Sequence, residues 1–167
     1  MIRTSYKKVL TSPENDDIIR MKKEKGATKM KTYTENEVRE HNRYYAGASA
    51  QRKKHGQGKP GTSRQDNISS RFSRIRYDEK DFVVYGYIDI PYIHKARLEA
   101  LEHDIKAILV EKGFKHTGND HFEYELDKRL SVEMNNKIFC IYCLLLAIKY
   151  CREHNLKYKL TWLGSAK

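Results

Sequence analysis

The sequence predicts an α+β domain over residues 81–167, preceded by a basic extension over residues 1–80. Three observations lead to this prediction. Apolar residues are scattered singly before position 80 and form periodic runs after it. The runs after position 81 alternate between strand-like and helix-like periods. Residues 1–80 carry 20 Lys/Arg against 10 Asp/Glu, whereas residues 81–167 carry 13 against 12. We therefore expect a domain boundary near residues 77–81.

The first two elements of the predicted domain are a strand and a helix. Residues 81–90 are rich in β-branched and aromatic side chains and are followed by Pro91, which favours a strand. Within residues 92–112, apolar side chains recur at spacings of three and four, and Gly113 follows as a C-terminal cap. This pattern predicts an amphipathic helix.

Four segments complete the predicted domain. Residues 114–117 and 121–127 flank a Gly-Asn-Asp turn, which favours a hairpin of two short strands. Ser131 can cap a second helix that runs to about His154, and residues 156–163 alternate as a final strand. The order strand, helix, strand, strand, helix, strand is typical of the ferredoxin-like split βαβ fold, with both helices on one face of an antiparallel sheet.

Side-chain alternation predicts which residues line the open face of this sheet. The even positions of the first strand, from Phe82 to Ile90, are apolar and should face the helices, so the odd positions should face outward. The open face is then an acidic stripe with two tyrosines. The candidates for contact with a partner or nucleic acid are Tyr85, Tyr87, His121, Glu123, Glu125, Lys157 and Lys159.

The basic extension carries the sharper functional prediction. Two short helices should begin at Ser12 and Thr34, the first stopping at Gly26 and the second at Gly47 or Gly56, and residues 51–61 read as an extended Gly/Lys/Arg-rich arm. Residues 41–76 hold nine basic groups against one acid, a composition suited to a polyanion. The candidate nucleic-acid contacts are Arg43, Tyr44, Tyr45, Arg52, Lys53, Lys54, Lys59, Arg64, Arg71, Phe72, Arg74 and Arg76. A solvated tail that folds back on Glu123 and Glu125 is the alternative.

The predicted fold and the basic arm together resemble the RNA-recognition-motif family. Residues 117–124 keep only Gly118 and Tyr124 of the family's third-strand pattern, and Asn119 and His121 stand where its stacking aromatics belong. The resemblance implies base stacking on the sheet, with Tyr85 as one platform.

These observations favour a non-catalytic protein that binds nucleic acid, RNA before DNA, or a ribonucleoprotein, with a protein partner on the α+β domain. One alternative is a phage or mobile-element inhibitor of a nucleic-acid enzyme, similar in size and composition to anti-CRISPR inhibitors of RNA-guided nucleases. Another is a ferredoxin-like endoribonuclease using Asp89, Glu123 and Glu125 on a metal, or His116 and His121 as acid and base.

We expect neither a cofactor nor a metal. Cys140, Cys143, Cys151 and His154 have zinc-like spacing, but on one continuous helix the first and last stand about 21 Å apart. The odd number of cysteines does not suit a disulfide framework, and no apolar run is long enough to span a bilayer. A cytoplasmic protein without membrane contact is the expectation.

Overall fold

The computed structural model describes residues 37–50, 55–118 and 120–164. Residues 35–167 form one compact unit. Its described part is an α+β fold in which a six-stranded antiparallel sheet is combined with three helices. The elements are β1 (Arg43–Ser49), β2 (Gly56–Ser63), α1 (Ile68–Asp78), β3 (Phe82–Asp89), α2 (Lys95–Glu111), β4 (Lys115–Thr117), β5 (His121–Tyr124), α3 (Val132–Glu153) and β6 (Lys159–Trp162).

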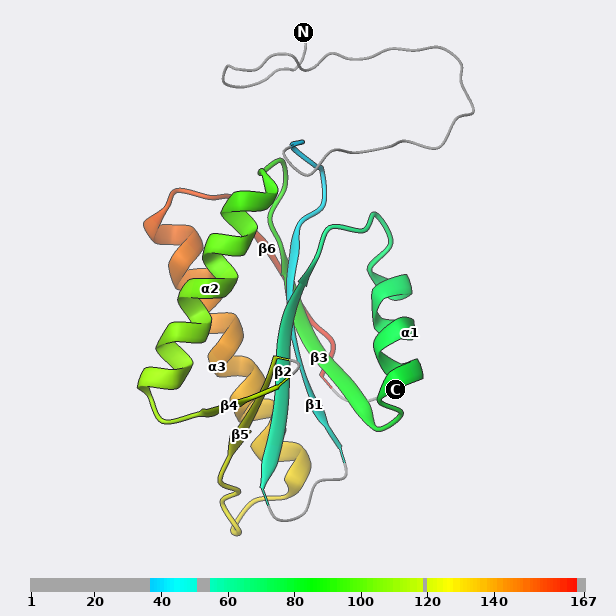
Figure 1. The fold of residues 1–167 in the computed structure, drawn as a ribbon, viewed down its shortest axis with the longest axis vertical. Helices are drawn as coiled ribbons and strands as arrows, with labels where there is room; N and C mark the ends of the chain where they lie inside the picture. Colours follow the sequence, from blue (N-terminus) through cyan, green and yellow to red (C-terminus); the bar gives the residue numbers. More distant parts are fainter. Residues whose placement is uncertain (1–36, 51–54, 119, 165–167) are drawn as a thin grey trace, which may run out of the picture. The chain divides into compact units, whose positions relative to one another are not determined.

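The strands are ordered β4-β5-β2-β1-β3-β6, and every neighbouring pair is antiparallel. Helices α2 and α3 cover one face of the sheet, which we call the α3 face, and α1 lies on the opposite α1 face (Figure 1). The larger core lies on the α3 face, where β1 and β3 pack against α2 and α3. A smaller core under α1 consists of Tyr45, Phe72, Ile75, Phe82 and Val84.

The six elements predicted for residues 81–167 are confirmed in type and order. Ser131 caps α3 as expected, since its Oγ accepts a hydrogen bond of 3.0 Å from the Met134 N–H. The three cysteines are free thiols buried along α3, and burial raises the pKa of Cys151 to about 11. Within the part of the chain that the structure describes, no helix has the length and apolar character needed to cross a membrane.

The structure differs from the prediction in residues 43–63. The predicted helix from Thr34 to Gly47 is wrong where the structure describes it, because Arg43–Ser49 is the strand β1. All seven of its residues are buried, since the strand lies in the middle of the sheet with a core on each side. The first predicted helix, from Ser12, lies outside the described residues.

The predicted extended arm contributes the strand β2, next to β1. The glycines that suggested an arm leave room for aromatic rings: a Cβ on Gly58 would come within 2.1 Å of the Phe139 ring. Pro60 is tolerated because β5 pairs with β2 only over Gly56–Gly58, so β2 has no neighbour on that side at Pro60. The predicted boundary at residues 77–81 therefore does not separate the sheet from the basic segment. Residues 51–54 of the arm lie outside the described residues.

Strand β3 carries a β-bulge that the alternation rule did not anticipate. Its register against β1 shifts so that Ala46 is opposite Gly86 while Gly47 is opposite Val84, which leaves Tyr85 as the extra residue. A bulge reverses the alternation beyond it. Val83 and Tyr85 consequently belong to the core on the α3 face, and Tyr87 packs with the core on the α1 face. The predicted outward positions of Val83 and Tyr85 are wrong for this reason.

Candidate nucleic-acid interface

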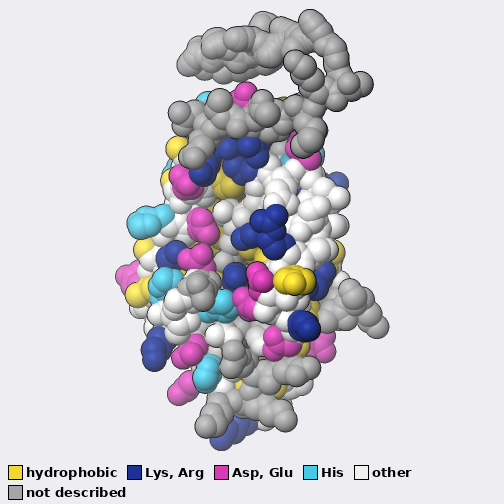
Figure 2. Space-filling view, turned by 45° about the vertical axis from the view of Figure 1, so that its right-hand side comes forward, with side chains coloured by type: hydrophobic (Ala, Val, Ile, Leu, Met, Phe, Trp, Pro, Cys, Tyr) yellow, Lys and Arg dark blue, Asp and Glu magenta, His cyan; other side chains and the backbone are white. Residues whose placement is uncertain are grey.

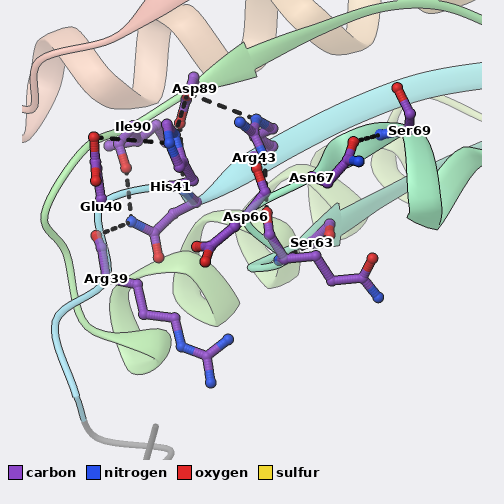
Figure 3. Close-up of polar contacts among 12 residues, drawn as sticks. Arg39, Glu40, His41, Arg43, Ser63, Asp66, Asn67, Ser69, Asp89 and Ile90 are labelled. Atoms are coloured by element: carbon purple, nitrogen blue, oxygen red, sulfur yellow. Dashed lines mark hydrogen bonds and ion pairs between the residues drawn. The ribbon is translucent and has the colours of Figure 1, made fainter. Parts of the chain in front are cut away.

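Helix α1 is the element of the basic segment that presents its side chains to solvent. Asn67 caps its first turn by accepting a hydrogen bond of 2.9 Å from the Ser69 N–H (Figure 3). Phe72 and Ile75, three residues apart, bury one stripe of the helix against the sheet. The opposite stripe is polar and basic.

The aromatic rings predicted to stack on bases lie mostly in the core. Tyr44 is buried on the α3 face, and Tyr45 and Phe72 pack edge to face under α1, with ring centroids 5.6 Å apart. Burial raises the pKa of both tyrosine hydroxyls. The charge of Arg71 acts to lower the pKa of Tyr45, but burial outweighs it. These three rings therefore hold the sheet together and are not available to a base.

Arg43 is also used within the fold. Its side chain is almost fully buried, its Nη1 donates a hydrogen bond of 2.8 Å to the Gln65 carbonyl, and its Nε lies 3.6 Å from Asp89 Oδ2. Asp89 also lies 3.0 Å from His41 Nδ1 and accepts from the Asn42 N–H at 3.3 Å (Figure 3). Asp89 thus joins the end of β3 to the start of β1, and Arg43 links both to the chain that enters α1.

Arg64 belongs to a second internal network. Its Nε donates a hydrogen bond of 2.9 Å to Asn42 Oδ1, and the fully buried Asn42 amide donates to the carbonyls of Arg39 and Ile90 at 2.9 and 2.8 Å. Burial, and after it the charge of Arg39, lowers the pKa of the Arg64 guanidinium. Arg64 therefore ties β2 to the ends of β1 and β3.

Lys59 meets an acid at the C-terminal end of α1. Its Nζ lies 3.2 Å from Glu79 Oε2, and the same carboxylate lies 3.0 Å from His121 Nε2. Burial alone would raise the pKa of Glu79, but the hydrogen bonds and charges of His121 and Lys59 together outweigh it and lower that pKa. Arg71, the fourth basic residue used within the fold, donates a hydrogen bond of 3.3 Å to the Tyr45 hydroxyl.

The outer surface of α1 carries the basic groups that remain. Arg74 and Arg76 are exposed and form no ion pair with another described residue. Tyr77 beside them is 82% exposed, and the exposed Lys80 follows the helix. We call these four residues the α1 outer surface. Lys80 was not among the sequence candidates, because it lies beyond the basic range 41–76 that the sequence indicated.

Arg52, Lys53 and Lys54 lie outside the described residues, but the point where their segment leaves β1 is defined. The Ala50 N–H donates a hydrogen bond of 2.8 Å to the Asp81 carbonyl, at the start of β3 and directly after α1. Ala50, which directly follows β1, therefore lies beside the C-terminal end of α1. Figure 2, turned to bring the α1 side of Figure 1 forward, shows Lys and Arg side chains interspersed with Asp and Glu.

The predicted sheet-face residues are only partly on one face. The strand register places four of them on the α1 face: Tyr87, His121, Glu123 and Lys159. Tyr85 lies on the other face, where it stacks on Trp162 with ring centroids 6.3 Å apart. Burial raises the pKa of Tyr85 to about 12. Glu125 and Lys157 are exposed and lie outside the strands.

Two acids of the predicted open face contact the basic segment. Glu123 lies 3.2 Å from His55, and Asp89 Oδ2 lies 3.6 Å from Arg43 Nε. The alternative in which the basic segment folds back on the acids of the domain therefore describes part of the structure. It does so through two central strands and not through a tail.

The residues considered for catalysis are not brought together. Asp89 on β3 and Glu123 on β5 are separated by β1 and β2, which is roughly 14 Å across the sheet at about 4.8 Å per strand. Asp89 is also in register with Ser63 and Glu123 with Gln57, which adds an offset of roughly 20 Å along the strands. His116 lies opposite Phe122, and its ring contacts that side chain of the α3-face core, whereas His121 reaches Glu79 on the α1 face. Among residues 37–50, 55–118 and 120–164, no three His, Cys, Asp or Glu residues are grouped for a metal ion.

Comparisons of the chain with protein-family models, with curated proteins and with solved structures found no match.

Proposed function

We propose that this protein binds nucleic acid, RNA before DNA, without catalysing a reaction. The contact is made by the α1 outer surface together with the basic residues 52–54. The observation that carries the proposal is the pair Arg74 and Arg76, exposed beside Tyr77 and without an ion-pair partner among the described residues. Arginines contact phosphates, and an exposed ring beside them can stack on a base.

The strand order supports a proposal about the fold. If β2 and β1 are taken out of the sheet order, β4-β5-β3-β6 remains. This is the strand order of a ferredoxin-like domain, so we propose such a domain with a hairpin inserted between its two central strands. Ala50, which follows β1, lies at the same end of the sheet as the C-terminal end of α1, and a protein partner would use the rest of the domain.

The test is fluorescence anisotropy of a labelled single-stranded RNA, titrated at several salt concentrations. The six basic residues of this surface, at about 0.7–0.9 counterions each, give an expected log–log salt slope of roughly −4 to −5.5. Removing two of them in R74A/R76A should flatten the slope by about 1.5. Tyr77→Ala should weaken binding about fivefold or more, while Tyr77→Phe keeps the ring and the affinity.

The matched control is R97A/K112A, which removes the same charge from α2 on the other side of the sheet. It should leave the slope within a few tenths of that of the unaltered protein. A slope near zero, or equal losses in both double variants, would refute the proposed surface. The recovered RNA should be intact, and cleavage that is lost in Glu123→Gln or His121→Ala would instead establish a nuclease.

A further inference from the structure

Helix α3 is apolar on its inner face and also on its outer one. Phe139, Cys140 and Cys143 bury the inner face against the sheet. On the opposite side, four large apolar side chains are exposed to solvent. They are Met134 (44% exposed), Ile138 (51%), Ile141 (42%) and Leu145 (56%). A contiguous exposed apolar surface of this kind marks an interaction site.

The spacing of these residues is that of a coiled-coil seam. The steps from 134 to 138, 141 and 145 are four, three and four residues, which is the alternation of d and a positions in a heptad repeat. We call these four residues the α3 seam. An α-helix drifts only slowly against this repeat, so over three turns the seam stays on one line along the helix. A seam of this width fits another helix.

The elements beside α3 leave the seam uncovered. On one flank, Tyr142 stacks on Phe114 at the end of α2, with ring centroids 5.9 Å apart. On the other flank, Leu144 lies beside Gly86 of β3. Leu160 and Trp162 of the edge strand β6 are on the same side of the sheet as α3 and are each more than 40% exposed. The apolar surface therefore extends from the seam toward the edge of the sheet.

We propose that the occupant of this surface is a second copy of the chain, paired through an antiparallel contact of the two α3 helices. In an antiparallel pair, each a position meets a d position of the other helix. One register puts Met134 against Leu145 of the partner subunit and Ile138 against Ile141 of the partner subunit. The same pairs recur in reverse, so all four seam residues are covered in a two-fold contact.

The charges on α3 select the antiparallel direction. The next seam position after Ile148 is Arg152, which a parallel pair would place against Arg152 of the partner subunit, like charge on like charge. The antiparallel register instead separates the two Arg152 side chains by about 25 residues, roughly 37 Å along the helix pair. The helix dipoles also oppose each other favourably in this arrangement.

The test is sedimentation velocity of the full chain with paired charge substitutions. The unaltered protein should be a dimer at micromolar concentration. M134E and L145K should each weaken the dimer at least about 30-fold, because each buries an unpaired charge at two symmetric places. The double variant M134E/L145K should restore dimerisation to within a few-fold, since each Glu then meets a Lys across the two-fold axis. Residues 134 and 145 are three turns apart, so this rescue cannot arise within one helix.

Val110→Glu is the control for these substitutions. It places a charge on an exposed apolar residue of α2 and should leave the dimer intact. Far-UV circular dichroism should be unchanged in every variant, and Met134→Ser and Leu145→Ser replace any that unfolds. A monomer throughout the micromolar to millimolar range would overturn the proposal, as would a dimer insensitive to both single substitutions. Single variants that dissociate without rescue in the double variant would reject the antiparallel pair and point to a different arrangement of the two copies.

Discussion

His121 illustrates how single residues of the α1 face fix the structure. Its Nδ1 lies 3.2 Å from the Gly118 carbonyl, and its Nε2 lies 3.0 and 3.1 Å from the two Glu79 oxygens. Both nitrogens are therefore placed against acceptors, and both contacts are hydrogen bonds only when each nitrogen carries a proton. A histidine that resembled a candidate acid or base in the sequence is in the structure the partner of a carboxylate.

The Glu79 carboxylate should contribute measurably to stability. Because its pKa is lowered in the folded state, its contribution is present above its ordinary pKa of about 4.3 and is lost as pH falls through the lower folded value. Glu79→Gln should lower the free energy of unfolding by about 1–2 kcal/mol at pH 7, since solvent partly screens the hydrogen bonds it removes.

Urea unfolding at pH 7 and at pH 3 measures this effect. The difference between the unaltered protein and the variant should shrink at the lower pH. Glu111→Gln, at an exposed position of α2, is the control and should change neither value. Equal stability of Glu79→Gln and the unaltered protein at pH 7 would contradict the assigned role.

Among the elements, β2 shows most clearly what sequence patterns do not reveal. Its sequence Gly-Gln-Gly-Lys-Pro-Gly-Thr-Ser has almost no apolar side chain, and it nevertheless lies beside β1 in the middle of the sheet. Side chains from other elements fill the space where a side chain of each glycine would stand. They are Tyr124 at Gly56, Phe139 at Gly58 and the Tyr45 hydroxyl at Gly61. The apolar groups that bury β2 come from residues far along the chain, so no local period indicates the strand.

A side chain at Gly58 should therefore be costly. The Phe139 ring that a Cβ would meet at 2.1 Å is buried and packs against the rings of Phe114 and Tyr124. Gly58→Ala should lower the free energy of unfolding by about 2–3 kcal/mol, as overpacking does elsewhere.

Gly118→Ala provides the comparison for this measurement by chemical denaturation. A Cβ at Gly118 would have no heavy atom within 4 Å, so the variant should lie within about 0.5 kcal/mol of the unaltered protein. If the two variants have the same stability, the close packing of β2 against Phe139 is not supported.

How well the other elements could be predicted depended on how regularly each one buries its apolar side chains. Helices α2 and α3 bury whole stripes, so their periods are visible in the sequence. In α1 only Phe72 and Ile75 are buried, too short a stripe to be distinguished from a basic segment. The bulge at Tyr85 reverses the faces of β3 next to Gly86, and an isolated glycine within a strand is a local sign of such a bulge. Of the odd positions of β3 that were expected to face outward, Val83 and Tyr85 were wrong because of that one extra residue.

The candidate interface was predictable only as a set of charges. Nine basic residues were identified in residues 41–76, and the structure uses Arg43, Lys59, Arg64 and Arg71 to hold the sheet. Their acceptors are carbonyls, a hydroxyl, an amide oxygen and carboxylates from distant parts of the chain. Sequence reasoning could not separate them from Arg74 and Arg76, because the difference lies entirely in tertiary contacts.

At the scale of the whole molecule, the basic segment cannot be removed without breaking the sheet. A fragment of residues 81–167 keeps β3 and β5 but loses β2 and β1, the two strands between them. We expect this fragment to lack a cooperative thermal transition, since both cores lose residues of β1. A fragment of residues 35–167, which is one compact unit, should melt cooperatively.

Circular dichroism melting, together with amide chemical-shift dispersion, distinguishes the two fragments. A cooperative transition in residues 81–167 would show that the C-terminal elements close a sheet without the hairpin. Loss of the transition in residues 35–167 would show that residues 1–34 are required for folding.

The position of the hairpin also bears on how the chain acquires its structure during synthesis. Strands β1 and β2 leave the ribosome before every other strand, and they are the middle of the finished sheet. Each later strand can then add at an open edge: β3 beside β1, β5 beside β2, and β4 and β6 outermost. The sheet can thus grow outward as the chain is made, with β4 and β5 added together as a hairpin, and no pairing that has already formed needs to open.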